Sequence, residues 1–164
     1  METSESAGKP SVYVETTIIS YLAASPSRDL VVAAHQQITH EWWNHQRERY
    51  DLFISQLVVD EASGGDAEAA ERRLALLSDV PRLPLLPESL ALAHEIIRAG
   101  LVPPKYATDA AHVALAAVHR MSYVLTWNCT HMANAAVKRR MEEFLRQAGF
   151  DPPILCTPEE MPEG

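Results

Sequence analysis

The chain has 164 residues, 47% of them hydrophobic, and carries a net charge of −8 at neutral pH. This length suits one domain with a core large enough to fold without disulfides or a structural metal. The acidic balance counts against a broad nucleic-acid binder, because phosphate contacts normally depend on Lys and Arg. It does not exclude a protein whose bound metal supplies the local positive charge.

Cysteine content and hydropathy indicate the cellular compartment in which the protein is expected to fold. Cys129 and Cys156 are the only cysteines, so there is neither a disulfide framework nor a zinc-ligand spacing. No apolar run approaches the roughly 18 residues that cross a bilayer, and the polar first residues lack the apolar region of a secretory signal. We therefore expect a cytoplasmic protein with no membrane association, with a disordered extension at 1–10, one domain at 11–160 and a tail at 161–164.

Short apolar runs alternate with amphipathic stretches along the chain. Apolar residues at three- and four-residue steps indicate helices, and short apolar runs between turn residues indicate strands. In chain order we predict a strand at 11–14, helices at 18–23 and 28–49, a strand at 52–54, helices at 56–62 and 66–78, a strand at 82–85, helices at 88–99 and 109–120, a strand at 123–126, a helix at 135–148 and a strand at 154–156. Thr108 is predicted to cap the helix at 109–120.

This alternation predicts an α/β fold: a three-layer α/β/α sandwich with a mostly parallel central sheet of four to five strands. We place the strand at 123–126 in the centre of the sheet. Three acidic residues, Glu15, Glu61 and Asp109, stand at predicted strand-to-helix junctions, and Asn128 follows the strand at 123–126. The carboxyl ends of parallel strands converge on one crevice, so these side chains are predicted to meet there.

Carboxylates gathered in one crevice repel one another unless a cation holds them. Oxygen ligands of this kind suit Mg²⁺ or Mn²⁺. The pattern therefore predicts a metal site. Each residue also has an ordinary alternative: Asp109 is a natural first-turn acid that stabilises a helix dipole, and Glu61 beside Asp60 suits a solvated face.

Four segments together resemble the PIN-domain family, over a stretch from about Ser11 to about Glu160. They are Val-Tyr-Val-Glu-Thr-Thr-Ile at 12–18, Val-Val-Asp-Glu at 58–61, Ala-Thr-Asp-Ala-Ala-His-Val-Ala at 107–114 and Leu-Thr-Trp-Asn at 125–128. Residues 105–114 and 123–134 are the most specific part. PIN domains are compact α/β/α nucleases that use Mg²⁺ or Mn²⁺ to cut RNA. Many bacterial members are VapC-type toxins of type II toxin–antitoxin pairs.

The resemblance implies that Glu15, Glu61 and Asp109 are catalytic residues that bind the metal, with Asn128 at the fourth catalytic position. Two of these depart from the family pattern. The first position is usually Asp, so Glu15 is one methylene longer, and the fourth is usually Asp, so Asn128 removes one negative charge. A site with three carboxylates and one amide is expected to hold metal more weakly than one with four.

Further residues are expected to orient the ligands rather than to bind metal: Thr16, His112 and His131. For His112, a hydrogen-bonded structural role inside a buried helix is the alternative. The resemblance also implies an RNA substrate and an antitoxin protein as partner, and we expect a homodimer. A basic cluster at Lys138, Arg139, Arg140 and Arg146 is predicted either to guide RNA or only to complement a helix dipole.

Two other classes remain open from the sequence. One is a catalytically weak or silent PIN-like module that binds a protein or RNA, which Asn128 favours and the three acids disfavour. The other is a different Mg²⁺-dependent enzyme such as a phosphatase. That class needs an Asp nucleophile after the first strand, where this chain has Glu15. No Gly-rich phosphate loop is present, so a nucleotide-cofactor enzyme is not expected.

Overall fold

The computed structural model describes residues 8–162. Residues 1–7 of the predicted extension at 1–10 and residues 163–164 of the predicted tail at 161–164 lie outside the described range, and the predicted domain limits remain predictions. Within the described range, none of the helices has both the length and the apolar character needed to span a bilayer.

Five short strands form one sheet in the order β3-β2-β1-β4-β5, and every neighbouring pair is parallel. The strands are β1 (Ser11–Val14), β2 (Asp51–Ser55), β3 (Arg82–Leu83), β4 (Tyr123–Leu125) and β5 (Ile154–Cys156). The predicted parallel sheet is confirmed. The predicted centre is wrong: β1 is central, with Tyr13 in register with Phe53 on one side and Val124 on the other. Both β1 and β4 are apolar runs, and an apolar run does not reveal which strands flank it.

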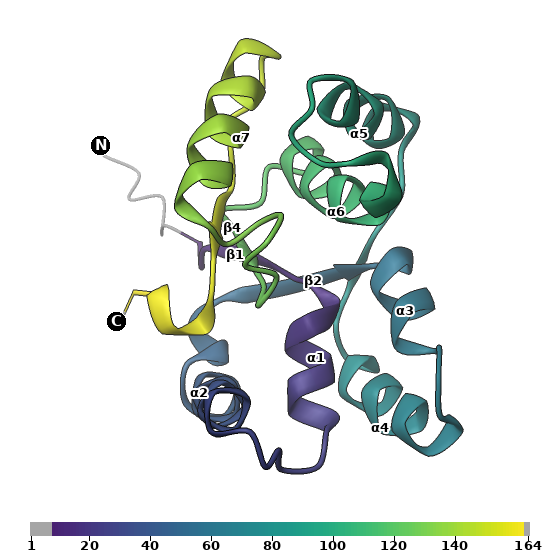
Figure 1. Ribbon diagram of the computed structural model, residues 1–164, viewed down its shortest axis with the longest axis vertical. Helices are drawn as coiled ribbons and strands as arrows, with labels where there is room; N and C mark the ends of the chain where they lie inside the picture. The colour runs from purple at the N-terminus through teal and green to yellow at the C-terminus, as the bar shows by residue number, and fades with distance from the viewer. Residues whose placement is uncertain (1–7, 163–164) are drawn as a thin grey trace, which may run out of the picture.

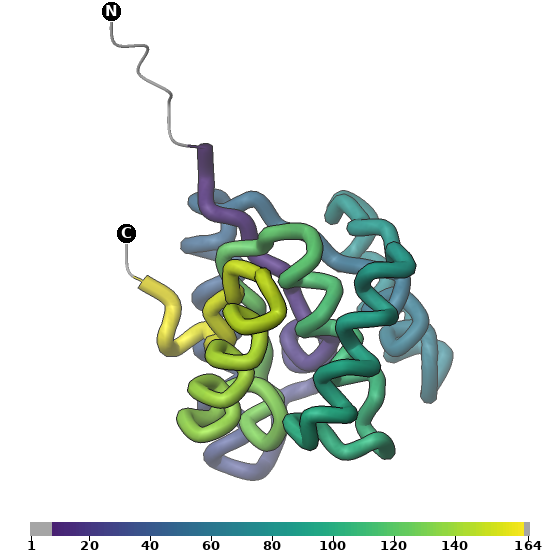
Figure 2. The backbone as a smooth tube through the Cα atoms, turned by 90° about the horizontal axis from the view of Figure 1, so that it is seen from above, coloured from purple at the N-terminus to yellow at the C-terminus, as the bar shows by residue number. Residues whose placement is uncertain are grey.

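Within residues 8–162, seven α-helices cover the two faces of this sheet. They are α1 (Thr16–Ala23), α2 (Leu30–His45), α3 (Gln56–Ala62), α4 (Ala67–Leu77), α5 (Pro87–Arg98), α6 (Ala107–Val118) and α7 (Ala135–Gln147). Figure 1 shows α5, α6 and α7 on one side of the sheet and α1, α2 and α4 on the other. Figure 2, turned by 90°, shows α5 and α6 side by side again. The predicted three-layer α/β/α sandwich is confirmed.

Local capping explains where several helices begin and end. The side chains of Asp29, Asp66 and Asn134 accept backbone N–H groups at the first turns of α2, α4 and α7. Gly100 and Gly149 follow α5 and α7 with φ of 76° and 90°, the left-handed conformation that closes a helix. These ends agree with the sequence pattern to within a residue or two.

The start of α6 differs from the prediction. Thr108 is not its N-cap, because a 3₁₀ turn, η2 (Pro104–Tyr106), runs directly into the helix at Ala107. Asp109 therefore lies in the first turn of α6. The body of α6 is buried and rich in alanine, which lets it pack closely against α5. The end of α6 leads directly into the start of β4, and the first turn of α6 contacts the loop after β4 through Asp109 and His131. The start of α6 therefore lies at the carboxyl end of the sheet.

Candidate active site at the carboxyl end of the sheet

Glu15 immediately follows β1 and is almost fully buried, with 3% of its surface exposed. Its Oε2 accepts a hydrogen bond from the backbone N–H of Thr17 at 2.7 Å, which makes Glu15 the N-cap of α1. Its Oε1 accepts from the hydroxyl of Thr17 at 2.9 Å and from the hydroxyl of Thr126 at 2.6 Å. Three neutral donors thus fix this carboxylate between β1 and the end of β4.

The electrostatic setting of Glu15 is unusual for a buried acid. Burial raises the pKa of its carboxyl, and the hydrogen bonds from Thr126 and Thr17 offset that rise only in part. Among residues 8–162, no Lys or Arg forms an ion pair with it. Buried carboxylates are usually paired or bound to metal. Glu15 therefore lies where a cation would be stabilising.

Glu61, near the end of α3, lies close to the start of α1, where it contacts Thr16, the residue after Glu15. Its Oε1 accepts a hydrogen bond from the Thr16 hydroxyl at 2.9 Å and lies 2.5 Å from Nε2 of His112. Burial is the largest influence on the Glu61 pKa and raises it, but interactions with His112 and Thr16, including a hydrogen bond with each, outweigh burial and leave that pKa lowered. Its side chain is 40% exposed. The predicted orienting residues Thr16 and His112 both contact Glu61.

The second ring nitrogen of His112, Nδ1, is also hydrogen-bonded, on the side away from Glu61. Its side chain is 1% exposed, and its Nδ1 lies 2.6 Å from the hydroxyl of Tyr13. That hydroxyl lies 2.8 Å from Oγ of Ser55, and both Tyr13 and Ser55 are fully buried. Burial, above all, raises the pKa of the Tyr13 phenol, and the nearby Glu15 and Glu61 charges add to the rise. His112 is therefore a buried, hydrogen-bonded histidine, which is the structural alternative that the sequence left open. Its Nε2 also contacts the candidate site residue Glu61.

Asp109 lies at the start of α6 and pairs with a different histidine. Its Oδ2 lies 2.8 Å from Nδ1 of His131, which belongs to the loop after β4. Their side chains are 19% and 13% exposed. The ring of Tyr106 packs against the His131 ring at 4.4 Å between centroids. His131 therefore holds Asp109 in place, as an orienting residue would.

Asn128 has a clear local role. Its Oδ1 accepts the backbone N–H groups of Thr130 and His131 at 3.2 and 3.0 Å. Its own N–H donates to the Thr126 hydroxyl at 2.9 Å. The amide thus ties down the loop that carries His131, and Thr126 links this loop to Glu15.

The three acids lie at the same edge of the sheet, and no two of them share a hydrogen-bond donor. Among residues 8–162, no three His, Cys, Asp or Glu side chains are placed together closely enough to hold a metal ion. The donor chemistry nevertheless fits a hard cation. Glu61 Oε2 and Asp109 Oδ1 accept no hydrogen bond from the described residues, and Glu15 is a buried acid without a cationic partner.

Sequence reasoning missed the residues that support the acids, namely Tyr13, Thr17, Ser55 and Thr126. Thr126 follows β4, and its place beside Glu15 depends on the pairing of β4 with β1, which the sequence does not reveal. Thr17 had only a weak signal, its place two residues after Glu15. Tyr13 and Ser55 had none: both look like ordinary strand residues.

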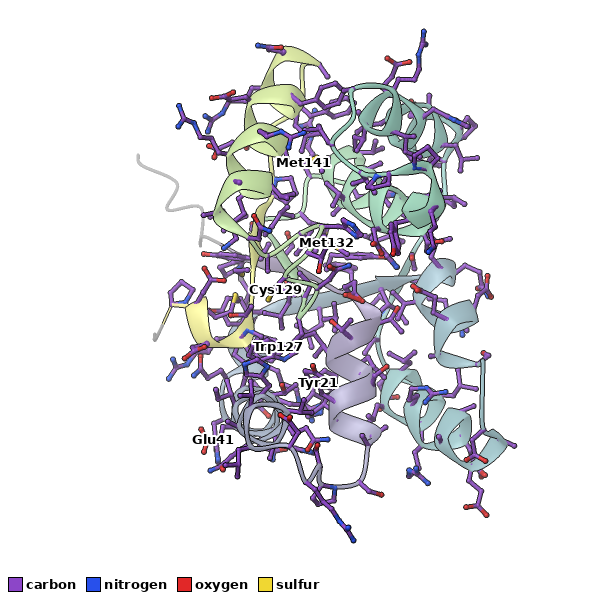
Figure 3. The ribbon with its side chains drawn as sticks, viewed as in Figure 1. Tyr21, Glu41, Trp127, Cys129, Met132 and Met141 are labelled. Carbon is purple, nitrogen blue, oxygen red and sulfur yellow. The ribbon has the colours of Figure 1, made fainter. Side chains whose placement is uncertain are left out.

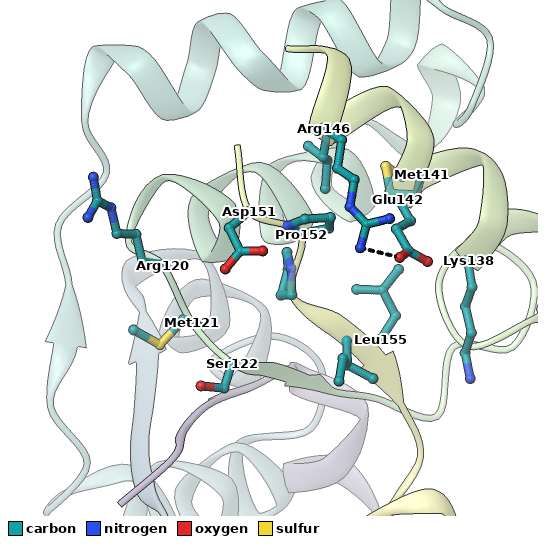
Figure 4. Close-up of a pocket in the computed structure, with 13 residues that line it drawn as sticks. Arg120, Met121, Ser122, Lys138, Met141, Glu142, Arg146, Asp151, Pro152 and Leu155 are labelled. Atoms are coloured by element: carbon teal, nitrogen blue, oxygen red, sulfur yellow. Dashed lines mark ion pairs between the residues drawn. The ribbon is translucent and has the colours of Figure 1, made fainter. Parts of the chain in front are cut away.

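The basic cluster at 138–146 is largely neutralised. Lys138 pairs with Glu160 at 2.7 Å, Arg139 with Glu143 at 3.5 Å and Arg146 with Glu142 at 2.7 Å, while Arg140 donates to the carbonyl of Gly100. Lys138 and Arg146 also line a cavity of about 490 Å³ (Figure 4). Its walls include Ser122 and Pro153, which precede β4 and β5, so it lies at the amino end of the strands. It is not part of the acidic site.

The loop after β4 is anchored by an aromatic side chain. Trp127 donates its indole N–H to the Thr39 hydroxyl at 2.7 Å and stacks on His35 with 4.1 Å between ring centroids. Figure 3 shows Trp127 beside Tyr21 of α1, and their ring centroids are 6.0 Å apart. These contacts fix the start of the loop that carries Asn128 and His131.

Comparison by sequence finds no protein-family model and no curated protein that matches this chain. Comparison by structure does find similar folds. A chain in the crystal structure of VapBC2 from Rickettsia felis, bound to a DNA fragment from its promoter, aligns with a TM-score of 0.57 at 15% identity. The alignment covers 90% of this chain and 98% of that one.

A second similar structure is VapC20 from Mycobacterium tuberculosis, a toxin that cleaves the sarcin–ricin loop. It aligns with a TM-score of 0.52 at 16% identity, over 69% of this chain and 86% of that one. At this level of identity the likeness concerns the fold. The resemblance expected from the sequence is confirmed at that level: the chain has the α/β fold of VapC toxins, the PIN fold.

Proposed function

We propose that this protein is a metal-dependent ribonuclease that hydrolyses RNA phosphodiester bonds, and that it acts as the toxin of a type II toxin–antitoxin pair. The observation that carries the proposal is Glu15: a buried carboxylate at the carboxyl end of the central strand, held by three neutral donors and without a cationic partner in residues 8–162. Desolvating such a charge is costly unless a cation compensates it.

In this proposal Glu15 and Asp109 would hold Mg²⁺ or Mn²⁺, and Glu61 would stabilise the bound cation either as a further ligand or through a water that the cation holds. The cation supplies Lewis-acid polarisation of a phosphate oxygen and makes a water more acidic. Glu61 has one oxygen engaged by Thr16 and His112, so its other oxygen is available to accept the proton of the attacking water. The start of α6, beside Asp109, adds a positive dipole end that favours a phosphate.

His131 and Asn128 have supporting roles. His131 fixes the Asp109 carboxylate through Nδ1, and Asn128 holds the loop that presents His131. Whether the Asn128 amide also reaches the cation is a separate part of the proposal, because its Oδ1 already accepts two backbone N–H groups.

The test is cleavage of single-stranded and structured RNA by the purified protein with Mn²⁺ or with a chelator. We expect cleavage with Mn²⁺ only, and its loss in Glu15→Gln and Asp109→Asn. Glu71→Gln and Asp79→Asn are matched controls, because both change an exposed carboxyl group away from the site. Chelator-resistant cleavage, or equal losses in the control variants, would reject the proposal.

The proposed toxin function also implies protein partners. VapBC2 was solved with a promoter DNA fragment, and by analogy we propose an antitoxin protein as partner of this chain. A homodimer and a cytoplasmic location are also proposed. Co-expression with the product of a neighbouring gene, followed by size-exclusion chromatography with light scattering, tests both assemblies.

A second candidate function has its own observation in its favour. Each of the three acids has its own hydrogen-bond donors, and no three-ligand cluster exists among the described residues. This favours a catalytically weak PIN-like module that binds protein or RNA. RNA binding that is independent of Mn²⁺, without cleavage, would support this module over the nuclease.

A further inference from the structure

We propose that Tyr13 is a positioning residue for Glu61: its phenol fixes the tautomer of His112, and His112 thereby holds Oε1 of Glu61 and leaves Oε2 free at the site. The proposal rests on the proposed function, in which Glu61 is a working carboxylate. It assigns a role to a β1 side chain that itself reaches neither substrate nor cation.

Four side chains form one continuous hydrogen-bonded chain that leads from the core to the site. Ser55 Oγ lies 2.8 Å from the Tyr13 hydroxyl, which lies 2.6 Å from His112 Nδ1, and His112 Nε2 lies 2.5 Å from Glu61 Oε1. The first three members are at most 1% exposed, whereas the Glu61 side chain is 40% exposed. Only the last member meets solvent.

The order of donors follows from counting protons. An ionised Glu61 only accepts, so His112 Nε2 must carry the proton it shares with Oε1. A neutral imidazole then has a bare Nδ1, which accepts the single proton of the Tyr13 hydroxyl. Ser55 in turn donates to the Tyr13 oxygen. In this order every hydroxyl proton of the chain has an acceptor.

The reverse order leaves a buried group unsatisfied. If His112 were doubly protonated, Nδ1 would donate to Tyr13 and Tyr13 would donate to Ser55. The Ser55 hydroxyl would then need another acceptor, and none is present among the described residues. Buried donors without acceptors cost stability, so the order that runs toward Glu61 is favoured.

Side chains that hydrogen-bond behind a metal-binding or catalytic group matter because they set the orientation of that group. Removing them typically weakens metal affinity or activity by about 10- to 100-fold. Tyr13→Phe keeps the ring in the core and removes only the hydroxyl. Tyr50→Phe is the matched control, because its hydroxyl donates instead to the carbonyl of Pro162 at the surface.

The first measurement is ¹⁵N NMR of histidine side chains at neutral pH without metal, with the His112→Gln variant to identify the signals of His112. We expect a protonated Nε2 and a bare Nδ1 in the wild type. Ser55→Ala should keep this pattern, since Tyr13 still donates to His112. Tyr13→Phe should alter the Nδ1 signal, and Tyr50→Phe should not.

The second measurement is the Mn²⁺ dissociation constant, obtained from the metal-dependent rise in melting temperature. We expect it to increase about 10- to 100-fold in Tyr13→Phe and to stay at the wild-type value in Tyr50→Phe. A protonated Nδ1 in the wild type, a changed pattern in Ser55→Ala, or wild-type Mn²⁺ affinity in Tyr13→Phe would overturn the proposal. Absence of RNA cleavage by the wild type would reject the proposed function alone, because both measurements are made without RNA.

Discussion

Nδ1 of His131 lies 2.8 Å from Oδ2 of Asp109, which joins the loop after β4 to the first turn of α6. The contact bridges 22 positions of sequence and leaves Oδ1 of Asp109 without a hydrogen bond from the described residues. A carboxylate that is oriented through one oxygen and open at the other is well prepared to bind a cation.

The first prediction concerns Asp109→Asn. The amide can still bond to His131, so the variant should fold, with a melting temperature near that of the wild type in chelator. Its rise in melting temperature on adding Mn²⁺ should be much smaller, because the stabilisation by a ligand grows with the logarithm of its concentration divided by its dissociation constant. Thermal melts with and without Mn²⁺ measure both. Asp79→Asn should behave as the wild type, and an equal Mn²⁺ effect in Asp109→Asn would remove Asp109 from the site.

The second prediction separates the two roles of Asn128. Asn128→Ala loses the acceptor of two backbone N–H groups and should lower the free energy of unfolding by about 1–2 kcal/mol. Asn128→Asp keeps that acceptor and adds a negative charge, so it should keep most of the stability and bind Mn²⁺ more tightly. Urea unfolding and Mn²⁺ titration measure the two effects. Unchanged or weaker Mn²⁺ affinity in the Asp variant would leave Asn128 with its loop role only.

The third prediction is a pH dependence from Glu61. The folded pKa of Glu61 lies below its ordinary value of 4.5, so the ionised carboxylate stabilises the fold above that pH. This stabilisation is lost as the pH falls through the folded pKa. The free energy of unfolding of the wild type should therefore exceed that of Glu61→Gln near neutral pH, and the difference should shrink in acid. Urea unfolding in chelator at several pH values measures it, and a difference that does not change with pH would contradict the His112–Glu61 pair.

The fourth prediction has the opposite sign. Burial raises the folded pKa of Glu15 above 4.5, so its contribution to stability is complete below pH 4.5 and is lost as the pH rises through the folded pKa. The advantage of the wild type over Glu15→Gln should therefore decrease as the pH rises in chelator. Saturating Mn²⁺ at neutral pH should restore part of it, because a bound cation favours the ionised form. If the difference in free energy of unfolding between the wild type and Glu15→Gln changed with pH in the same direction as that for Glu61→Gln, the raised pKa of Glu15 would be contradicted.

The sequence alone determined the layers of this protein and the end of the sheet where the acids gather. Strands such as β1 and β5 were predicted at their observed bounds, because their signals, short apolar runs between turn residues, are local. The common edge of Glu15, Glu61 and Asp109 was also predictable, because parallel strands with helical crossovers bring their carboxyl ends to the same side.

Only the tertiary structure decided which residues support those acids. Tyr13 and His112 are 99 positions apart, and Glu15 and Thr126 are 111 apart, so no local pattern links either pair. The central place of β1 also depended on which strands pair with it. Strand order and long-range hydrogen bonds arise from packing the whole chain, since each buried polar group must find a partner wherever the fold brings one.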